Sequence, residues 1–171
     1  MLVVETGWGD PDANSYASLA DVRAYAAMRG YALPADDAAL EILIYLATDY
    51  VDGFRGRFQG VKSFDNQALQ WPRMGVAIDC IAVPYDTIPV PLVQAIAQLC
   101  VEQHAGVELN ATAVGGDAAI IEETVGPLTT KYAAPASGSS ASGPNMPKVA
   151  ALLAPLFSAC GNGGLFRTVR V

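Results

Sequence analysis

The residues best equipped for chemistry are cations and aromatic rings that alternate between positions 54 and 73. The candidate contact residues are Phe54, Arg55, Arg57, Phe58, Lys62, Trp71 and Arg73. Arginine and lysine can follow a phosphate backbone while aromatic rings stack on unpaired bases. The same residue types are enriched in protein–protein interfaces, where a guanidinium group pairs with carboxylates. The stretch therefore indicates a contact with single-stranded nucleic acid or with another protein, and its composition favours the protein.

The charge of the whole chain works against nucleic acid. The 171 residues include 17 acidic and 10 basic side chains, so the net charge is −7 at pH 7. Bulk attraction to a phosphate backbone is not expected, and any affinity for DNA must be local. Apolar residues make up 52% of the sequence and charged residues only 16%. So little charge predicts an apolar surface that a partner subunit covers.

The sequence gives no positive reason to expect an enzyme, a cofactor or a metal. His104 is the only histidine, and its position late in an apolar helical stretch predicts a packing role. No His, Cys and Asp cluster has metal-ligand spacing, and no glycine-rich nucleotide-binding motif occurs. Acid–base chemistry would have to use carboxylates alone. Asp49 and Asp52 share a helix face, and we expect both to be solvated.

The cysteines and the hydropathy indicate the cellular compartment of the chain. Cys80, Cys100 and Cys160 lie far apart and predict buried thiols in a reducing compartment. The first residues lack the basic and apolar regions of a signal peptide. The sequence contains no run of 18 apolar residues, so no membrane span is predicted. We therefore expect a cytoplasmic protein without a membrane partner.

Two helices are predicted to precede the basic–aromatic stretch. The first follows a cap at Ser18, and Gly30 is a natural stop. The second runs from a cap at Asp36 or Asp37 to Gly53, with apolar residues at helical spacing over a broad arc. The second helix therefore ends directly before the candidate contact residues.

Two further helices and two extended segments complete the predicted fold. A third helix begins near Pro91 and a fourth at Pro147, because proline is favoured in the first turn. Residues 74–89 indicate an extended loop. The pattern at 119–132 predicts a β-hairpin, and 164–171 a C-terminal strand. The expected fold class is mainly α, a small bundle of about four helices with a β-hairpin and a C-terminal extended arm.

The composition also divides the chain. Residues 1–132 are expected to form the helical core with its hairpin, and residues 133–147 a flexible linker rich in Ala, Ser, Gly and Pro. Residues 148–171 would then pack as a helix and a strand on the core or on a neighbouring subunit. The candidate arm contacts are Ile120, Val125, Leu128, Tyr132, Phe166, Arg167 and Arg170.

Several short motifs, in their order and spacing, resemble a family of small tailed-phage and prophage proteins. The motifs are ANSYASLADVRAYAAMRG at 13–30, ATDYVDGFRGRFQG at 47–60, QALQWPRMGV at 67–76, IPVPLVQAIAQLCVE at 88–102, VGPLTTKY and VAALLAPL. The resemblance covers nearly the whole chain, except about 107–118 and the linker. That family carries the label of a DnaT-like single-stranded-DNA-binding protein, and it also resembles the head–tail adaptors of tailed phages.

The adaptor resemblance implies a structural virion protein without catalytic residues. Such adaptors form a ring, typically of twelve copies, beneath the portal protein, and genomic double-stranded DNA passes through the lumen without tight binding. The implied partners are further copies, the portal, and tail or stopper proteins. The implied location is the virion neck, after assembly in the host cytoplasm. The alternative is a replication accessory protein that binds single-stranded DNA through residues 54–73, which the acidic pI makes the less favourable of the two.

Overall fold

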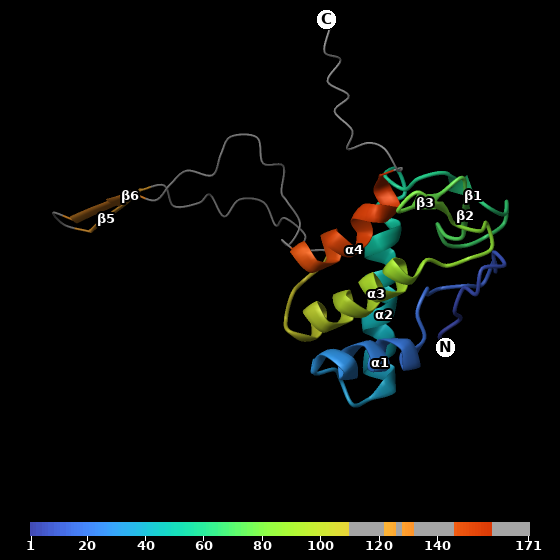
Figure 1. The fold of residues 1–171 in the computed structure, drawn as a ribbon. Coiled ribbons are helices and arrows are strands. Elements are labelled where there is room, and N and C mark those ends of the chain that lie inside the picture. Colours follow the sequence, from blue (N-terminus) through green and yellow to red (C-terminus); the bar gives the residue numbers. More distant parts are fainter. Residues whose placement is uncertain (110–121, 126–127, 132–145, 159–171) are drawn as a thin grey trace, which may run out of the picture. The chain divides into compact units, whose positions relative to one another are not determined.

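The computed structural model describes residues 1–109, 122–125, 128–131 and 146–158. The chain divides into two compact units, one formed by residues 1–107 and 146–171 and the other by residues 108–145. Four helices and a few short hairpins make the fold mainly α, as the sequence predicts (Figure 1). None of the helices within the described ranges is long and apolar enough to span a membrane.

Helix α1 (Leu19–Arg29) begins and ends where its capping residues dictate. The Asp21 backbone N–H donates to Ser18 Oγ at 3.1 Å, and the Ser18 N–H donates to Asp21 Oδ2 at 3.0 Å. These reciprocal bonds form a capping box and satisfy two otherwise unpaired donors. Gly30 then adopts a left-handed conformation with φ of 69° and closes the helix. Both predicted ends are confirmed.

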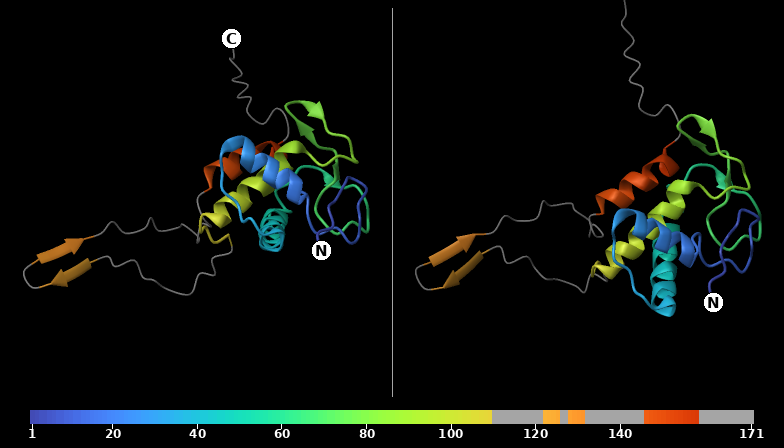
Figure 2. Two further views of the ribbon diagram at one scale, coloured as in Figure 1. Left: turned by 90° about the horizontal axis from the view of Figure 1, so that it is seen from below. Right: turned by 60° about the horizontal axis from the view of Figure 1, so that its bottom comes forward.

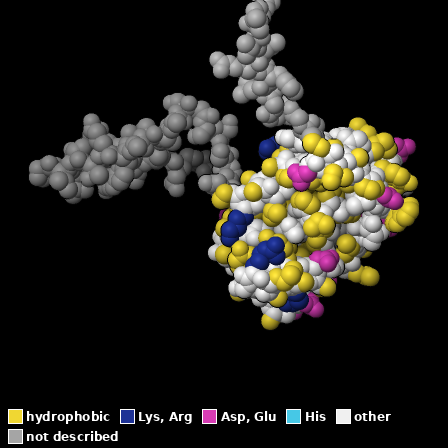
Figure 3. All heavy atoms as spheres, viewed as in Figure 1, with side chains coloured by type: hydrophobic (Ala, Val, Ile, Leu, Met, Phe, Trp, Pro, Cys, Tyr) yellow, Lys and Arg dark blue, Asp and Glu magenta, His cyan; other side chains and the backbone are white. Residues whose placement is uncertain are grey.

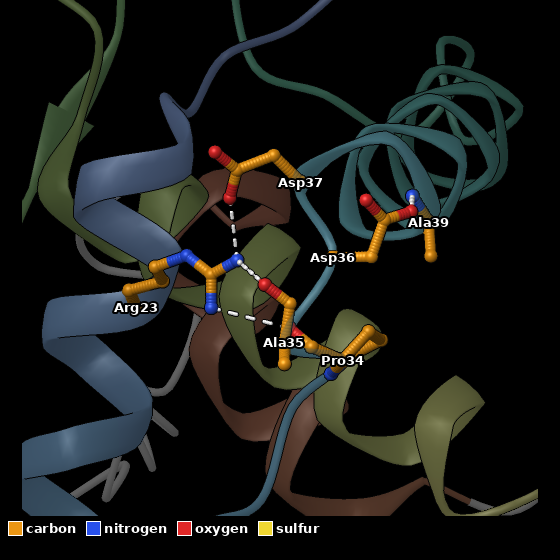
Figure 4. A network of polar contacts seen from close by, with 6 residues as sticks. All are labelled: Arg23, Pro34, Ala35, Asp36, Asp37 and Ala39. Atoms are coloured by element: carbon orange, nitrogen blue, oxygen red, sulfur yellow. Dashed lines mark hydrogen bonds and ion pairs between the residues drawn. The ribbon is translucent and has the colours of Figure 1, made fainter.

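Helix α2 (Asp37–Asp52) is capped by Asp36, whose carboxylate accepts a backbone hydrogen bond in the first turn at 2.9 Å. Arg23 of α1 fixes the connection between the two helices (Figure 4). Its guanidinium donates to the Pro34 carbonyl at 3.1 Å and to Asp37 Oδ1 at 2.5 Å. The arginine therefore sets the direction in which α2 leaves α1.

Helix α3 (Val90–His104) is the centre of the first unit. It contacts α1, α2 and α4 (Pro147–Phe157), and Figures 1 and 2 show these three helices around it. Its buried residues are Leu92, Ala95, Ile96, Ala97, Gln98, Leu99 and Cys100. Each large aliphatic side chain buried here contributes about 1.5–3 kcal/mol. Because α3 and α4 pack together, the second unit is an insertion between two adjacent helices of the core.

Short hairpins surround the basic–aromatic stretch. β1 (Val61–Lys62) pairs with β2 (Arg73–Met74), and β3 (Ala77–Ile78) pairs with β4 (Ile81–Ala82), both antiparallel. The prediction of one extended loop at 74–89 is therefore wrong, because residue 80 turns the chain back. The second unit contains the predicted hairpin, in which β5 (Glu122–Val125) pairs with β6 (Leu128–Lys131).

Two single-residue predictions also need correction. His104 is exposed at the end of α3 and is not a packing residue. Cys80 is exposed and disulfide-bonded, whereas Cys100 is buried and free, as predicted. Cys160 and the predicted C-terminal strand at 164–171 lie outside the described residues.

Candidate interaction surface around residues 54–73

The aromatic rings of this stretch form a packed row with a residue from α4. Phe54 packs edge-on against Tyr50 at a centroid distance of 5.2 Å and against Phe157 at 5.8 Å. Phe58 continues the row, 5.4 Å from Phe157 and 5.7 Å from Trp71. Each such pair adds about 0.5–1.5 kcal/mol beyond the area that it buries. The rings therefore fasten α4 to the end of α2.

Burial removes two of the three candidate rings and one of the four candidate cations from the surface. Trp71 has 0% of its surface exposed, Phe58 7% and Arg73 6%. The Arg73 guanidinium donates to the carbonyls of Gln59 and Gly60, both at 2.7 Å, and to a third carbonyl at 3.2 Å. Burial lowers the pKa of Arg73 from its ordinary value. Arg73 thus holds the backbone of the β1–β2 region in place. Its guanidinium donates to the chain's own carbonyls and not to a phosphate or a partner's carboxylate.

Gln59 is the residue that joins this stretch to α4, and no pattern in the sequence marks it. Its backbone N–H donates to the Leu156 carbonyl at 3.0 Å. Its side-chain Nε2 donates to the carbonyls of Pro155 at 2.8 Å and Ser158 at 2.6 Å. Because these carbonyls lie in the last turn of α4 or directly after it, no later helical N–H can reach them, and they need donors from outside the helix. Gln59 supplies those donors.

The cations that remain accessible are Arg55 and Arg57. Arg57 lies over the Phe157 ring, with its Cζ 4.3 Å from the centroid, which restrains the side chain. Lys62 is half-buried and donates to the Gln67 carbonyl at 3.2 Å. Within the described residues the ion pairs are Arg23–Asp37 and the N-terminal amine with Glu41. Arg55 and Arg57 are therefore exposed without an ion-pair partner in the part of the chain that the structure describes.

A buried tyrosine–aspartate pair supports the stretch from beneath. The Tyr16 hydroxyl donates to Asp52 Oδ1 and accepts the Gln70 and Trp71 N–H groups at 2.8 and 3.2 Å. The Gln70 N–H also lies 3.1 Å from Asp52 Oδ2. Burial raises the pKa of Asp52 to about 6, although the Tyr16 hydrogen bond opposes the shift. Burial, followed by the Asp52 charge, raises the pKa of Tyr16 well above its ordinary value.

The predicted solvated face is thus only half right. Asp49 is exposed, but Asp52 points inward and holds three segments together. In sequence the two carboxylates are equivalent, three positions apart on one helix. What distinguishes them is the distant Tyr16, which no local pattern could reveal.

Apolar side chains are spread widely over the surface. Figure 3 shows hydrophobic side chains across the whole visible face of the described core, with basic and acidic groups at scattered places. The exposed large hydrophobic residues are Met1, Trp8, Met28, Ile42, Leu46, Val61, Met74, Ile81, Tyr85 and Val90. Ile42 and Leu46 lie one helical turn apart on α2, on the side away from its buried residues. Singly exposed apolar residues are normal on a protein surface, so the adjacent pair Ile42 and Leu46 is the feature here that bears on association.

The structure places few of the predicted arm contacts. Val125 and Leu128 pair across the β5–β6 hairpin next to its turn. Ile120, Tyr132, Phe166, Arg167 and Arg170 lie outside the described residues. Among the described residues, no group of three or more His, Cys, Asp or Glu side chains could hold a metal ion.

Comparison with known proteins gives one match. A family model described as "Putative DnaT-like ssDNA binding protein" matches residues 1–171. No curated protein and no solved structure matches the chain.

Proposed function

We propose that this chain, which belongs to the family of putative DnaT-like ssDNA binding proteins, is a non-enzymatic assembly protein. The specific assignment is a head–tail adaptor that forms a ring beneath the portal of a tailed phage. Genomic double-stranded DNA would pass through the ring, and the portal and tail or stopper proteins would be its neighbours. The sequence resemblance and the burial of the basic–aromatic stretch support this assignment.

The observation that carries this proposal is the burial of Trp71, Phe58 and Arg73. These side chains are three of the seven candidates for stacking on bases and binding phosphate. A binding platform for single-stranded DNA needs exposed rings beside exposed cations. Here Phe58 packs against Phe157 of α4, Trp71 packs against Phe58, and the guanidinium of Arg73 donates to backbone carbonyls. What remains at the surface, apolar side chains and two arginines, suits contact with protein.

The charge distribution supports the same function. The net charge of −7 repels phosphate, and a lumen that repels phosphate lets a duplex slide. The exposed charged side chains of residues 1–52 are five acidic and one basic, whereas those of residues 53–73 are Arg55, Arg57 and Asp65. Opposite charges on different parts of one chain favour a head-to-tail contact between copies. Such a contact closes into a ring when its rotation allows.

The inserted hairpin is suited to reach a neighbour. In the described structure β5 and β6 form a sheet of two strands, so each strand has one edge without a partner strand. Unpaired strand edges bind other chains by adding strands. Because the second unit is inserted between two packed helices, it can engage a neighbour without opening the core. We propose that β5–β6 is the arm by which the adaptor holds the portal or an adjacent copy.

The test of this function is the mass of the native particle. The chain, purified alone and with the portal of the same genome, is measured by native mass spectrometry. We expect a ring of defined copy number, formed by the chain alone or on the portal. Residues 108–145 can be replaced by a short Gly–Ser linker as a matched variant, which should fold but lose portal binding. A strict monomer that never joins the portal would overturn the proposal.

Binding of single-stranded DNA is the second candidate, and the description of the family favours it. Arg55 and Arg57 are the exposed cations that could serve it, with Phe54 half-buried beside them. This function requires salt-sensitive binding of an oligothymidylate. Changing both Arg55→Ala and Arg57→Ala would then weaken binding. For the adaptor, the same double change would weaken assembly and leave any weak DNA binding unaltered.

A further inference from the structure

Trp8 is displayed at the tip of a loop in the first unit. Its side chain is 68% exposed, although tryptophan is normally among the most buried residues on average. It lies in the segment ETGWGD, which has the composition of an irregular turn. The question is whether this exposure is incidental or whether the loop is built to present the ring.

The loop is held from beneath by a buried carboxylate. Glu5 is only 2% exposed, and its oxygens accept three backbone hydrogen bonds from the loop that follows. Gly7 and Gly9 donate to Oε1 at 2.7 and 3.0 Å, and Asp10 donates to Oε2 at 2.8 Å. Charge-assisted bonds of this kind are the stronger class of hydrogen bond. The backbone on both sides of Trp8 is therefore fixed to one internal anchor.

Two glycines press the same loop against the core. Gly7 has φ of 110°, and a Cβ there would lie 1.9 Å from the Asp86 carbonyl oxygen. Gly9 has φ of 70°, and a Cβ there would lie 2.5 Å from the Phe64 ring. Only glycine combines these conformations with such close approach. With its backbone restrained on both sides, Trp8 loses little conformational entropy when it binds, as a preorganised anchor should.

An aromatic ring lies beside the loop, and acidic residues neighbour this region in sequence. The Phe64 ring, on which Gly9 rests, is paired with the ring of Tyr85 at a centroid distance of 6.3 Å. We call Trp8, Phe64 and Tyr85 the Trp8 patch. Acidic residues flank each part of it in sequence, namely Asp10, Asp65 and Asp86. Lys62, the cation nearest to Phe64 in sequence, donates to the Gln67 carbonyl. An aromatic patch with this charge repels phosphate and fits a cationic protein surface.

The chain itself carries such a surface. Turn 55–57 presents Arg55 and Arg57, which are exposed and make no ion pair within the described residues. An arginine can stack on an indole ring while its N–H groups reach nearby carboxylates. Building on the proposed assembly function, we propose that the Trp8 patch of one copy docks on turn 55–57 of a second copy. Because the two surfaces differ, the contact is head-to-tail. Each copy can take part in two such contacts, one through its Trp8 patch and one through its turn 55–57.

The experiment uses Trp8 as its own reporter. The variant Trp71→Phe leaves Trp8 as the single tryptophan, and it removes no hydrogen bond because Trp71 Nε1 has no partner among the described residues. Acrylamide quenching, emission wavelength and sedimentation are measured together over a range of concentrations. If Trp71→Phe does not fold, the same measurements on the native chain still report Trp8, since Trp71 is inaccessible to quencher. We expect assembly to shift the emission to shorter wavelength and to protect Trp8 from quencher.

Two variants then test which surfaces meet. Trp8→Ala and the double change Arg55→Glu/Arg57→Glu should each remain monomeric when alone. Mixed in equal amounts they should form dimers and nothing larger, because each dimer has one intact contact and two defective ends. Met28→Ala is the matched control, since Met28 is 76% exposed on α1, and it should assemble like the native chain.

The outcomes separate this inference from the function on which it builds. Assembly in which Trp8 remains open to quencher overturns the docking contact and leaves the assembly function standing. A native chain that stays monomeric at every concentration and forms no ring with the portal overturns both the docking contact and the assembly function. Protection of Trp8 only after addition of an oligothymidylate also overturns the contact, and it assigns the ring to base stacking.

Discussion

The stretch 54–73 and loop 5–10 are both rich in aromatic or charged groups, and the fold uses them in opposite ways. In the first, Trp71 is fully buried and the Arg73 guanidinium serves the chain's own carbonyls. In the second, the charged group is inside and the ring is outside, because buried Glu5 ties down the backbone beside exposed Trp8. The comparison teaches that the location of a residue's partners, more than its type, decides whether it can serve binding.

The two tryptophans provide the strongest test of this difference between a buried and an exposed ring. We expect Trp71→Ala to destabilise the protein by about 3–5 kcal/mol, because it opens a cavity where the fully buried ring packs against Phe58. Trp8→Ala should change the free energy of unfolding by less than about 0.5 kcal/mol. Urea unfolding followed by circular dichroism measures both. Equal effects of the two changes would contradict the assignment of one ring to the core and the other to the surface.

Arg73 and Arg55 provide the corresponding test for the cations. Arg73→Ala leaves three carbonyls without their donor, and we expect a loss of about 2–3 kcal/mol in the free energy of unfolding. Arg55→Ala should be nearly neutral, since the described residues offer Arg55 no partner. Thermal unfolding of the two variants at equal concentration compares them. A neutral Arg73→Ala would mean that this guanidinium is available for a ligand after all.

Substitution of Gly7 tests whether the backbone of loop 5–10 is held against the core. Gly7→Ala must overcome both a left-handed backbone and a clash with the Asp86 carbonyl, which predicts a cost of about 1–3 kcal/mol. Gly30→Ala is the control, because Gly30 has φ of 69° and no atom within 4 Å of its added Cβ. It should cost about 1 kcal/mol. Hydrogen exchange at the Gly7 and Gly9 amides should accelerate in the first variant alone, and unchanged protection would argue against a loop held in place by Glu5.

The pH dependence of stability tests the Tyr16–Asp52 pair that supports the stretch 54–73. Its pKa is raised from the ordinary 3.8 to about 6, so the folded state favours the neutral carboxyl. The stabilisation is fully present below about pH 4 and is lost as the pH rises through 6, a change of about 3 kcal/mol. Asp52→Asn removes this titration. The stability of the native chain minus that of the variant should therefore fall between pH 4 and 6.5, and a constant difference would exclude the titration of Asp52.

Much of the fold follows from local signals in the sequence. Ser18, Asp36 and Gly30 mark helix ends through interactions within a few residues, which is why their roles could be predicted. The β3–β4 hairpin could not be predicted, since residues 79 and 80 adopt positive φ without the glycine that normally signals such a turn.

The site was harder to predict because its determinants are distant in sequence. The burial of Trp71 depends on Tyr16, Phe58 and α4, the last of which lies beyond the inserted second unit. In the sequence Gln59 looks like any polar loop residue, and only its contact with α4 shows its role. Composition could therefore identify a region of unusual chemistry but not the direction in which its side chains point.

The most direct test of the assembly function is the native mass of the purified chain, measured with and without an equimolar oligothymidylate. We expect a discrete multiple of the 17.8 kDa chain mass, unchanged by the oligonucleotide. A 17.8 kDa monomer that gains the mass of one oligonucleotide would contradict it and would assign the chain to binding single-stranded DNA.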